Sequence, residues 1–213
     1  RSVTAQEVCL RIPKIEYLVR QGAFGTSAQW NSILAELKRA IASIEWPKGS
    51  GGFYFQDGST GRSRGEGNGV KPIKDAFCAY LESVGWQRET PVDIATLRKP
   101  GPIDVTKAIP KVGLVAAEWE TGNISSSHRS VNKMALGLLN GVLVAGVVVL
   151  PTRAMYKYLT DRIGNYDELS PYFPLWNAVP IGNGVLAVIA IEHDGTRADA
   201  PRIPKGTDGR ALI

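Results

Sequence analysis

The segment that decides the fold is VGLVAAEWETGN, residues 112–123. Its first six residues are almost all apolar, which predicts a buried β-strand over 112–120. Because side chains alternate along a strand, Glu118 and Glu120 share one face and Trp119 takes the other. Two alternating glutamates are also typical of a solvated strand face. A buried carboxylate, however, needs a metal or a cationic partner, so the apolar context favours a functional role.

A third carboxylate precedes this strand in the sequence. The run GPID ends at Asp104, which we expect at the end of an earlier extended segment, close to Glu118 and Glu120. Like charges held that close repel strongly. A divalent cation removes the conflict, and Mg²⁺ prefers one or two carboxylates together with carbonyl oxygens and water. The three residues therefore predict a Mg²⁺ site.

Helices and strands are predicted to alternate around this segment. Helical spacing of apolar residues predicts helices over 27–46, 72–84, 125–139, 152–162 and 167–173. Unbroken apolar runs predict buried strands over 142–150 and 185–191. The central strand leads into the helix at 125–139, capped by Ser125 or Ser126, whose first turn can approach a phosphate or a DNA groove. We expect an α/β fold with a mixed central β-sheet flanked by helices on both faces.

Two regions are predicted to be irregular. Residues 48–69 contain eight glycines with Arg62 and Arg64 around a short aromatic strand, which indicates a flexible basic loop that either follows phosphates or is a plain surface loop. It lacks the Walker spacing, so no nucleotide cofactor is expected. Residues 193–213 read as an irregular C-terminal tail. The chain, 1–213, has the size of a single domain.

Composition limits the class of protein. The net charge of +5 and sequence pI near 9.2 fit a polyanionic partner. Cys9 and Cys78 lack metal-ligand spacing and indicate reduced thiols of an intracellular protein, with a disulfide as the alternative. The longest apolar run, 142–150, is too short to cross a bilayer, and no signal-peptide pattern opens the chain. We therefore expect a soluble, cytoplasmic protein with no membrane partner.

The central segment resembles the BamHI type of type II restriction endonuclease. The resemblance rests on EWETGNISS (118–126), HRS (128–130) and NK (132–133). Further matches, in the same order, are NGV (68–70), PIK (72–74), RE (88–89), GPIDV (101–105), YLTDR (158–162), PYF (171–173), IPKG (203–206) and DG (208–209). They cover most of 68–209, whereas the first sixty or so residues match weakly. Glu120 stands where related nucleases usually carry Lys.

The resemblance implies a restriction-endonuclease-like fold and a Mg²⁺-dependent active site. Its metal ligands would be Asp104, Glu118 and the backbone carbonyl of Trp119, with Glu89 for a second metal. Glu120 would act as general base, which makes Asp104, Glu118, Glu120 and Glu89 the catalytic set. Taken alone, Glu89 would be interpreted as a surface residue.

The resemblance also implies double-stranded DNA as partner and substrate. Base contacts would come from Asn123, Ser125, Arg129, Asp161 and Arg162, with the palindrome GGATCC as target. Lys74 and His128 would face DNA, and Asp208 belongs to a segment that approaches the minor groove. Taken singly, Asn123 is typical of a turn and Ser125 of a helix cap.

A palindromic target implies a two-fold symmetric homodimer, packed through residues 126–139 and 156–162. Two other functions remain open from the sequence. One is a DNA-binding protein that does not cleave. The other is a repair or recombination nuclease that recognises DNA structure rather than sequence.

Overall fold

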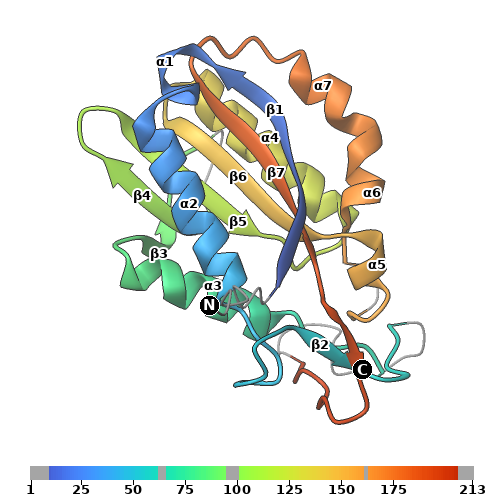
Figure 1. Cartoon of the computed structure of the whole chain (residues 1–213). Helices are drawn as coiled ribbons and strands as arrows, with labels where there is room; N and C mark the ends of the chain where they lie inside the picture. The colour runs from blue at the N-terminus through green and yellow to red at the C-terminus, as the bar shows by residue number, and fades with distance from the viewer. Residues whose placement is uncertain (1–9, 62–65, 95–100, 161–162, 206–213) are drawn as a thin grey trace, which may run out of the picture.

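The computed structural model describes residues 10–61, 66–94, 101–160 and 163–205. A six-stranded sheet in the order β1-β7-β6-β5-β4-β3 runs through its centre (Figure 1). Its strands are β1 (Arg11–Gln21), β3 (Gln87–Pro91), β4 (Pro102–Ile109), β5 (Gly113–Trp119), β6 (Leu143–Pro151) and β7 (Gly184–Glu192). The central strands β5, β6 and β7 are parallel, and the outer pairs are antiparallel. The predicted mixed sheet is confirmed.

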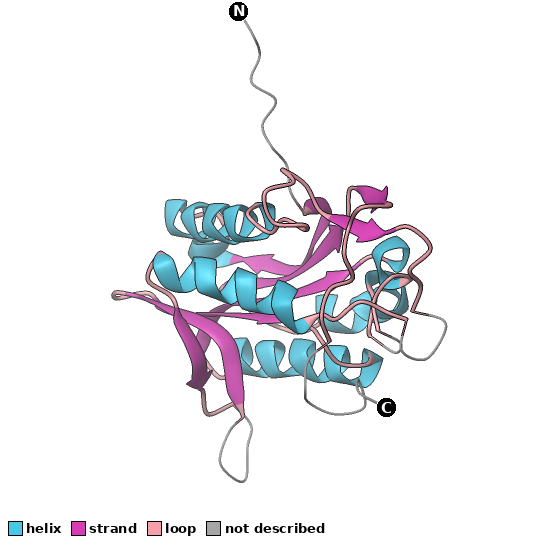
Figure 2. Ribbon diagram, turned by 90° about the horizontal axis from the view of Figure 1, so that it is seen from below, coloured by secondary structure: helices cyan, strands magenta, loops and turns pink. Residues whose placement is uncertain are grey.

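Helices cover both faces of this sheet, as Figure 2 shows. They are α1 (Gly22–Gly25), α2 (Ala28–Ala42), α3 (Lys71–Ser83), α4 (Ile124–Leu139), α5 (Arg153–Tyr156), α6 (Tyr166–Leu169), the 3₁₀ turn η1 (Ser170–Tyr172) and α7 (Phe173–Asn177). One core cluster joins α2 and α3 to the sheet, and a second joins α4, α6 and α7 to its other face. Because both faces of β6 and β7 are covered, these strands are apolar along nearly their whole length.

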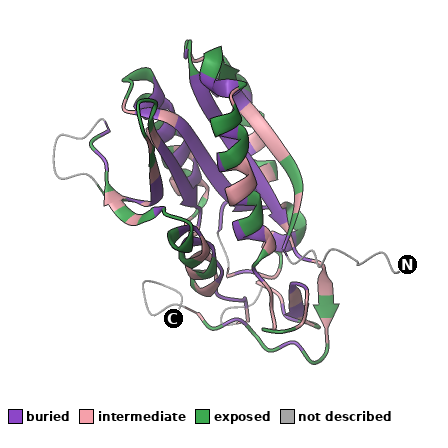
Figure 3. Ribbon diagram, turned by 60° about the vertical axis from the view of Figure 1, so that its left-hand side comes forward, coloured by how far each residue is buried: buried purple, intermediate pink, exposed green. Residues whose placement is uncertain are grey.

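The predicted helices at 27–46, 72–84 and 125–139 correspond to α2, α3 and α4. Ser27 caps α2, since its hydroxyl accepts a hydrogen bond from the Trp30 N–H at 3.0 Å. Trp30 and Leu37 are fully buried against the sheet, while the outward positions of the helices are exposed (Figure 3). The helix ends at Ala42, four residues before the predicted end.

The strand β1 was not predicted, and it is one edge of the sheet. The strand has eleven residues, eight of which pair with residues of β7, and the register shifts at two places. Its exposed positions carry Arg11, Lys14 and Arg20. Charged side chains and bulges of this kind protect an edge strand against pairing with another chain.

The helix predicted over 152–162 is present only as α5, which ends at Tyr156, and the prediction was wrong for 157–160; residues 161–162 lie outside the described part of the chain. The backbone after α5 bonds to Asn68 instead: the Asn68 N–H donates to the Tyr158 carbonyl at 2.8 Å, and the Thr160 N–H donates to the Asn68 carbonyl at 2.9 Å. The predicted helix over 167–173 is present as the series α6, η1 and α7, and it continues to Asn177.

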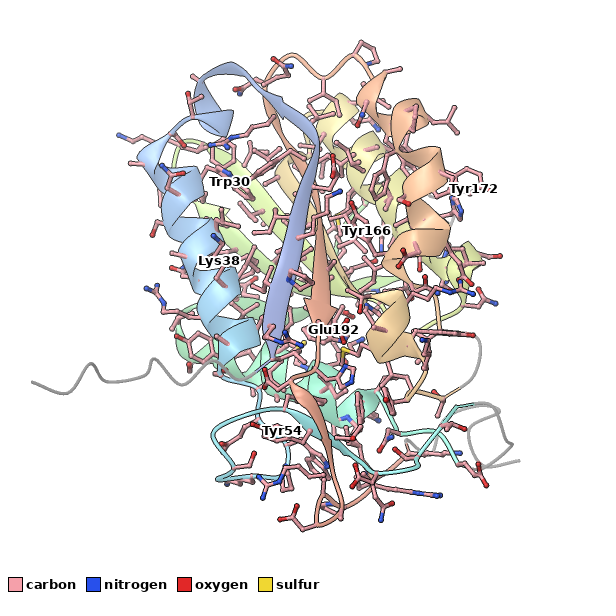
Figure 4. All side chains as sticks on the ribbon, turned by 45° about the vertical axis from the view of Figure 1, so that its right-hand side comes forward. Trp30, Lys38, Tyr54, Tyr166, Tyr172 and Glu192 are labelled. Carbon is pink, nitrogen blue, oxygen red and sulfur yellow. The ribbon has the colours of Figure 1, made fainter. Side chains whose placement is uncertain are left out.

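The short aromatic strand predicted in the glycine-rich loop is confirmed, and the described part of the tail also contains a strand, which was not predicted. The loop and the tail each supply one strand of a small parallel sheet, β2 (Tyr54–Gln56) with β8 (Gly195–Arg197). Phe53 and Phe55 are buried, and the Phe55 ring stacks on Tyr158 with centroids 5.1 Å apart. Figure 4 shows Glu192 at the end of β7, just before this small sheet, and Tyr54 within it. A glycine is required at Gly61, because a Cβ there would collide with the Leu159 carbonyl.

Among the helices of the described residues, none combines the length and the hydropathy that a membrane-spanning segment requires.

Candidate active site

The predicted acidic residues meet where β4 and β5 separate. The β4–β5 ladder ends at the pair Val105–Ala117, so Asp104 and Glu118 each lie one residue beyond it. Asp104 is near the start of β4 rather than at the end of an extended run, which corrects the expectation. Because β4 is antiparallel to β5, its beginning lies beside the end of β5. The topology therefore brings the two segments together.

Glu118 faces helix α4 and is paired there with a lysine. Its side chain lies in the interior, with only 8% of the residue exposed. The Lys133 ammonium donates to Glu118 Oε1 at 2.8 Å. A buried carboxylate requires such a partner, and here α4 supplies it.

Asp104 is held by two donors on the side of helix α3. Its Oδ1 pairs with the Lys74 ammonium at 2.6 Å, and its Oδ2 accepts the Trp119 N–H at 2.9 Å. Burial raises the pKa of Asp104 above its usual value; the bonds from Lys74 and Trp119 oppose the rise, and the negative charge of Glu118 adds to it.

Glu120 lies just beyond the end of β5, under the first turns of α4, and 7% of it is exposed. Its two oxygens accept the Gly122 N–H at 2.7 Å and the Ser130 hydroxyl at 3.0 Å. Burial raises its pKa above the usual value. These hydrogen bonds oppose the rise, and the charges of Glu118 and Asp104 add to it. A higher pKa makes the carboxylate a stronger base.

The predicted alternation along this strand is borne out by the partners of its residues. Glu118 and Glu120 both bond to side chains of α4, whereas the Trp119 ring lies against Phe77 of α3, with centroids 5.0 Å apart. Trp119 therefore points to the opposite face of the sheet.

Among the described residues, no three acidic, histidine or cysteine side chains are close enough to form a ready-made ion site. The carboxylates of Asp104 and Glu118 are each occupied by a lysine instead. The donors themselves fit a hard cation, since two carboxylates and a backbone carbonyl at Trp119 are all oxygen ligands of the kind that Mg²⁺ accepts. A site of this composition needs no third acidic side chain.

Glu89 lies opposite Asp104 in the sheet and has an unusual backbone. The β3–β4 register pairs Arg88 with Val105 and Thr90 with Ile103, which places Glu89 across from Asp104. Its φ of +49° is left-handed, a conformation that costs energy for a residue other than glycine and that is concentrated at functional sites. Glu89 is exposed.

The N-terminus of α4 presents polar side chains to solvent beside the carboxylates. Asn123, rather than Ser125 or Ser126, is the cap, since its Oδ1 accepts the Ser126 N–H at 3.1 Å. Asn123, Ser125 and Arg129 are all exposed. The unpaired N–H groups and the dipole of the helix make this end favourable for a phosphate.

The remaining predicted DNA contacts differ in their placement. Lys74 is engaged with Asp104 and is about a quarter exposed. The His128 ring packs between Tyr172 and Trp176, with centroids 4.3 and 5.5 Å away, so it is directed to the 170–177 segment rather than grouped with the exposed residues. Asp161, Arg162 and Asp208 lie outside the described residues.

Sequence reasoning did not assign roles to Lys133, Ser130 and Gly122, which hold the glutamates. Their spacing carried a signal: Ser130 and Lys133 are three residues apart and thus share one face of a helix, as Glu118 and Glu120 share one face of a strand. At Gly122, a Cβ would lie 2.6 Å from the Ser126 side chain and 3.0 Å from Glu120 Oε1, so the turn between Glu120 and α4 requires a glycine.

Comparison with known proteins gives consistent matches. The family model described as restriction endonuclease BamHI matches residues 10–210. Type II restriction enzyme OkrAI of Oceanobacter kriegii is 44% identical over 203 residues, which cover 95% of this chain and 100% of that protein. Type II restriction enzyme BamHI of Bacillus amyloliquefaciens is 39% identical over 180 residues, 82% of this chain and 80% of that protein. The similarity thus extends into the N-terminal part, which was expected to match weakly.

A solved structure shares the fold. Restriction endonuclease BglII, complexed with a DNA 16-mer, superposes with a TM-score of 0.60 at 9% sequence identity, covering 85% of this chain and 79% of that one. The predicted restriction-endonuclease-like α/β fold is therefore confirmed.

Proposed function

The chain belongs to the BamHI family of type II restriction endonucleases, and we propose that it cleaves both strands of duplex DNA at the palindrome GGATCC with Mg²⁺ as cofactor. The observation that carries this proposal is the position of two buried carboxylates, Glu118 and Glu120, with Asp104 at the adjoining strand, next to an exposed helix N-terminus. Chemistry and sequence reading would then take place on one continuous segment, 104–129 in the numbering of the chain.

Asp104, Glu118 and the carbonyl of Trp119 would hold the Mg²⁺, with Glu89 available to a second ion. When bound, the ion supplies positive charge that neutralises the scissile phosphate and lowers the pKa of water. Glu120 takes the proton of the attacking water as general base. Hydrogen bonds from Gly122 and Ser130 orient its carboxylate, and its raised pKa in the metal-free protein suits a proton acceptor.

Arg129, Asn123 and Ser125 would read base edges in the major groove. Arginine pairs with guanine, asparagine with adenine, and serine with either. All three side chains are exposed on the first turns of α4, which supports this role. Asp161 and Arg162 would complete the set.

A palindromic site cut on both strands favours a homodimer with one active site for each strand. Exposed apolar side chains on α4 and the helical segment beside it support this: Leu136, Leu139, Tyr172 and Leu175. In Figure 4, Tyr172 lies at the outer surface of that segment. We also propose that each subunit is a single endonuclease domain, because both core clusters are built on the same sheet.

Digestion of a plasmid of known sequence tests the proposal. We expect Mg²⁺-dependent fragments whose ends all map to GGATCC. Defined fragments that end at another sequence would reject the specificity and keep the enzyme class. Binding to the site without any cleavage would support a non-cleaving DNA-binding protein, and cuts confined to branched or damaged DNA would support a structure-specific nuclease.

A further inference from the structure

Two of the proposed metal ligands are bonded to lysines from helices on opposite faces of the sheet. Lys133 of α4 donates to Glu118 at 2.8 Å, and Lys74 of α3 pairs with Asp104 at 2.6 Å. A third carboxylate, Glu120, lies on the same face of the strand as Glu118 and is bonded to Gly122 and Ser130 instead of a lysine. The two lysines therefore each compensate the negative charge of one proposed metal ligand.

The Lys133–Glu118 pair occupies an oxygen that the metal would need. Mg²⁺ binds carboxylate oxygens at about 2.0–2.1 Å, whereas the ammonium nitrogen lies 2.8 Å from Glu118 Oε1. Two cations on one carboxylate repel each other strongly because their charges are poorly screened in a buried site. Lys133 and the metal therefore compete for Glu118.

Of the two partners, Lys133 is the one that can withdraw. Glu118 belongs to β5, which is paired on both sides of the strand. The lysine has a long flexible side chain with 23% exposure, so it can turn toward solvent while its helix stays in place.

We propose that Lys133 is the resident counter-ion of Glu118 in the metal-free protein and that it must leave Glu118 when the metal enters, so Lys133 sets the metal affinity of the site. This rests on the proposed function, since it takes Glu118 as a metal ligand. Lys133 is thus a positioning residue that acts through Glu118. In the absence of metal, its positive charge compensates the negative charge of the buried Glu118 carboxylate.

The test is a titration of the DNA-free protein with Mn²⁺, in which the electron paramagnetic resonance signal of free Mn²⁺ measures how much of the ion is bound. Lys133→Gln removes the competing charge and should bind Mn²⁺ roughly tenfold more tightly, as expected for the loss of one nearby like charge. Lys133→Arg should bind more weakly than the wild type, because a guanidinium holds a carboxylate with two hydrogen bonds.

The chain offers a matched control in Lys107. Its ammonium also lies 2.8 Å from a glutamate, Glu36, and its side chain is also 23% exposed. Lys107→Gln should leave the Mn²⁺ affinity unchanged. Thermal unfolding adds a second readout: metal-free Lys133→Gln should melt below the wild type, and saturating Mn²⁺ should raise its Tm more than that of the wild type.

The outcomes separate this inference from the proposed function. If the wild type binds Mn²⁺ and Lys133→Gln binds it equally or more weakly, the counter-ion inference is overturned and the metal site stands. If Asp104→Asn leaves Mn²⁺ binding intact, or if neither the wild type nor Lys133→Gln binds Mn²⁺, both fail. Tighter binding by Lys133→Gln, abolished by adding Asp104→Asn, supports both.

Discussion

Glu120 is the residue on which the chemistry depends most directly. It has no lysine partner among the described contacts but two neutral donors, Gly122 and Ser130, which leaves it able to accept a proton. We expect Glu120→Gln to bind the target DNA as the wild type does and to cleave it about 10²- to 10⁴-fold more slowly, the range typical of a lost general base. Single-turnover kinetics measure the cleavage rate, and a binding titration measures the affinity for the target DNA. Cleavage near the wild-type rate would remove Glu120 from the mechanism.

Arg129 tests sequence reading at the scale of one side chain. It is exposed on α4, and its guanidinium donates a long hydrogen bond of 3.4 Å to Ser126 Oγ, so the group is available to a base. Arg129→Ala should weaken binding to GGATCC by about 1–3 kcal/mol and leave binding to random DNA nearly unchanged. Titrations with both duplexes distinguish the roles: an equal loss on random DNA would make Arg129 a phosphate contact.

For single residues, the sequence predicted on which face of the strand a side chain lies better than it predicted the residues to which that side chain bonds. The alternation of Glu118 and Glu120 followed from the period of a strand, which is local. Their partners Lys133 and Ser130 depend on how α4 is rotated over the sheet, which no local pattern determines. The left-handed backbone of Glu89 also had no local signal, because glutamate does not favour it.

Among the elements, the start of α4 is tied to the segment before α6. The Gly164 N–H donates to the Gly122 carbonyl at 2.9 Å, and a Cβ on Gly164 would collide with Ser127 Oγ. Gly164→Ala should therefore destabilise the protein by about 1–3 kcal/mol, as overpacking does, and reduce discrimination between GGATCC and other sequences. Denaturant unfolding measures the first effect and competitive binding the second.

The matched control is Gly182→Ala, because nothing lies within 4 Å of a Cβ at that position. It should be neutral in both measurements. If the two variants are equally stable, the Ser127 side chain moves away from the added methyl group at position 164 with no loss of folding free energy, which would contradict the prediction.

Glu192, at the end of β7, should make the stability of the folded protein depend on pH. Burial alone would raise the pKa of Glu192, but hydrogen bonds from His193 and Thr152 outweigh it and hold that pKa below the usual value. Folding is thus stabilised above the usual carboxyl pKa of about 4.3, and this stabilisation is lost as the pH falls through the lower value of the folded state. At pH 7 the Tm of the wild type should be higher than that of Glu192→Gln. This difference in Tm should disappear as the pH is lowered and Glu192 becomes protonated. A gap independent of pH would contradict the assignment.

Elements with a strong period were predictable, and those fixed by distant contacts were not. The strands β6 and β7 were expected because they are continuous apolar runs. Residues 157–160 had helical spacing too, but the backbone at Tyr158 and Thr160 pairs with Asn68 instead. The strand β1 mixes charged and apolar residues because it is an edge strand, so its pattern is weak.

The whole molecule is predicted to work as a dimer. Leu175 of α7 is 68% exposed and Tyr172 of the adjoining turn is 46% exposed, which is unfavourable for an isolated chain. Sedimentation should give twice the chain mass of 23.0 kDa, and Leu175→Asp should shift the population to monomer. A wild type that sediments as a monomer when bound to its target would reject the dimer.

The layered architecture followed from the alternation of helices and buried strands, and the small β2–β8 sheet did not. Its strands have three residues each and come from segments about 140 residues apart, so only the folded chain shows that they pair. The same holds for the site: β4 and β5 each carry a carboxylate, but the point at which they separate is a property of the sheet.

The most direct test of the central claim is a crystal structure with Mn²⁺ and a duplex containing GGATCC, using Glu120→Gln to prevent cleavage. We expect an anomalous peak bound by Asp104 and Glu118, with the N-terminus of α4 in the major groove and Arg129 against a base. A metal bound elsewhere, or that end of α4 turned away from the DNA, would contradict the account.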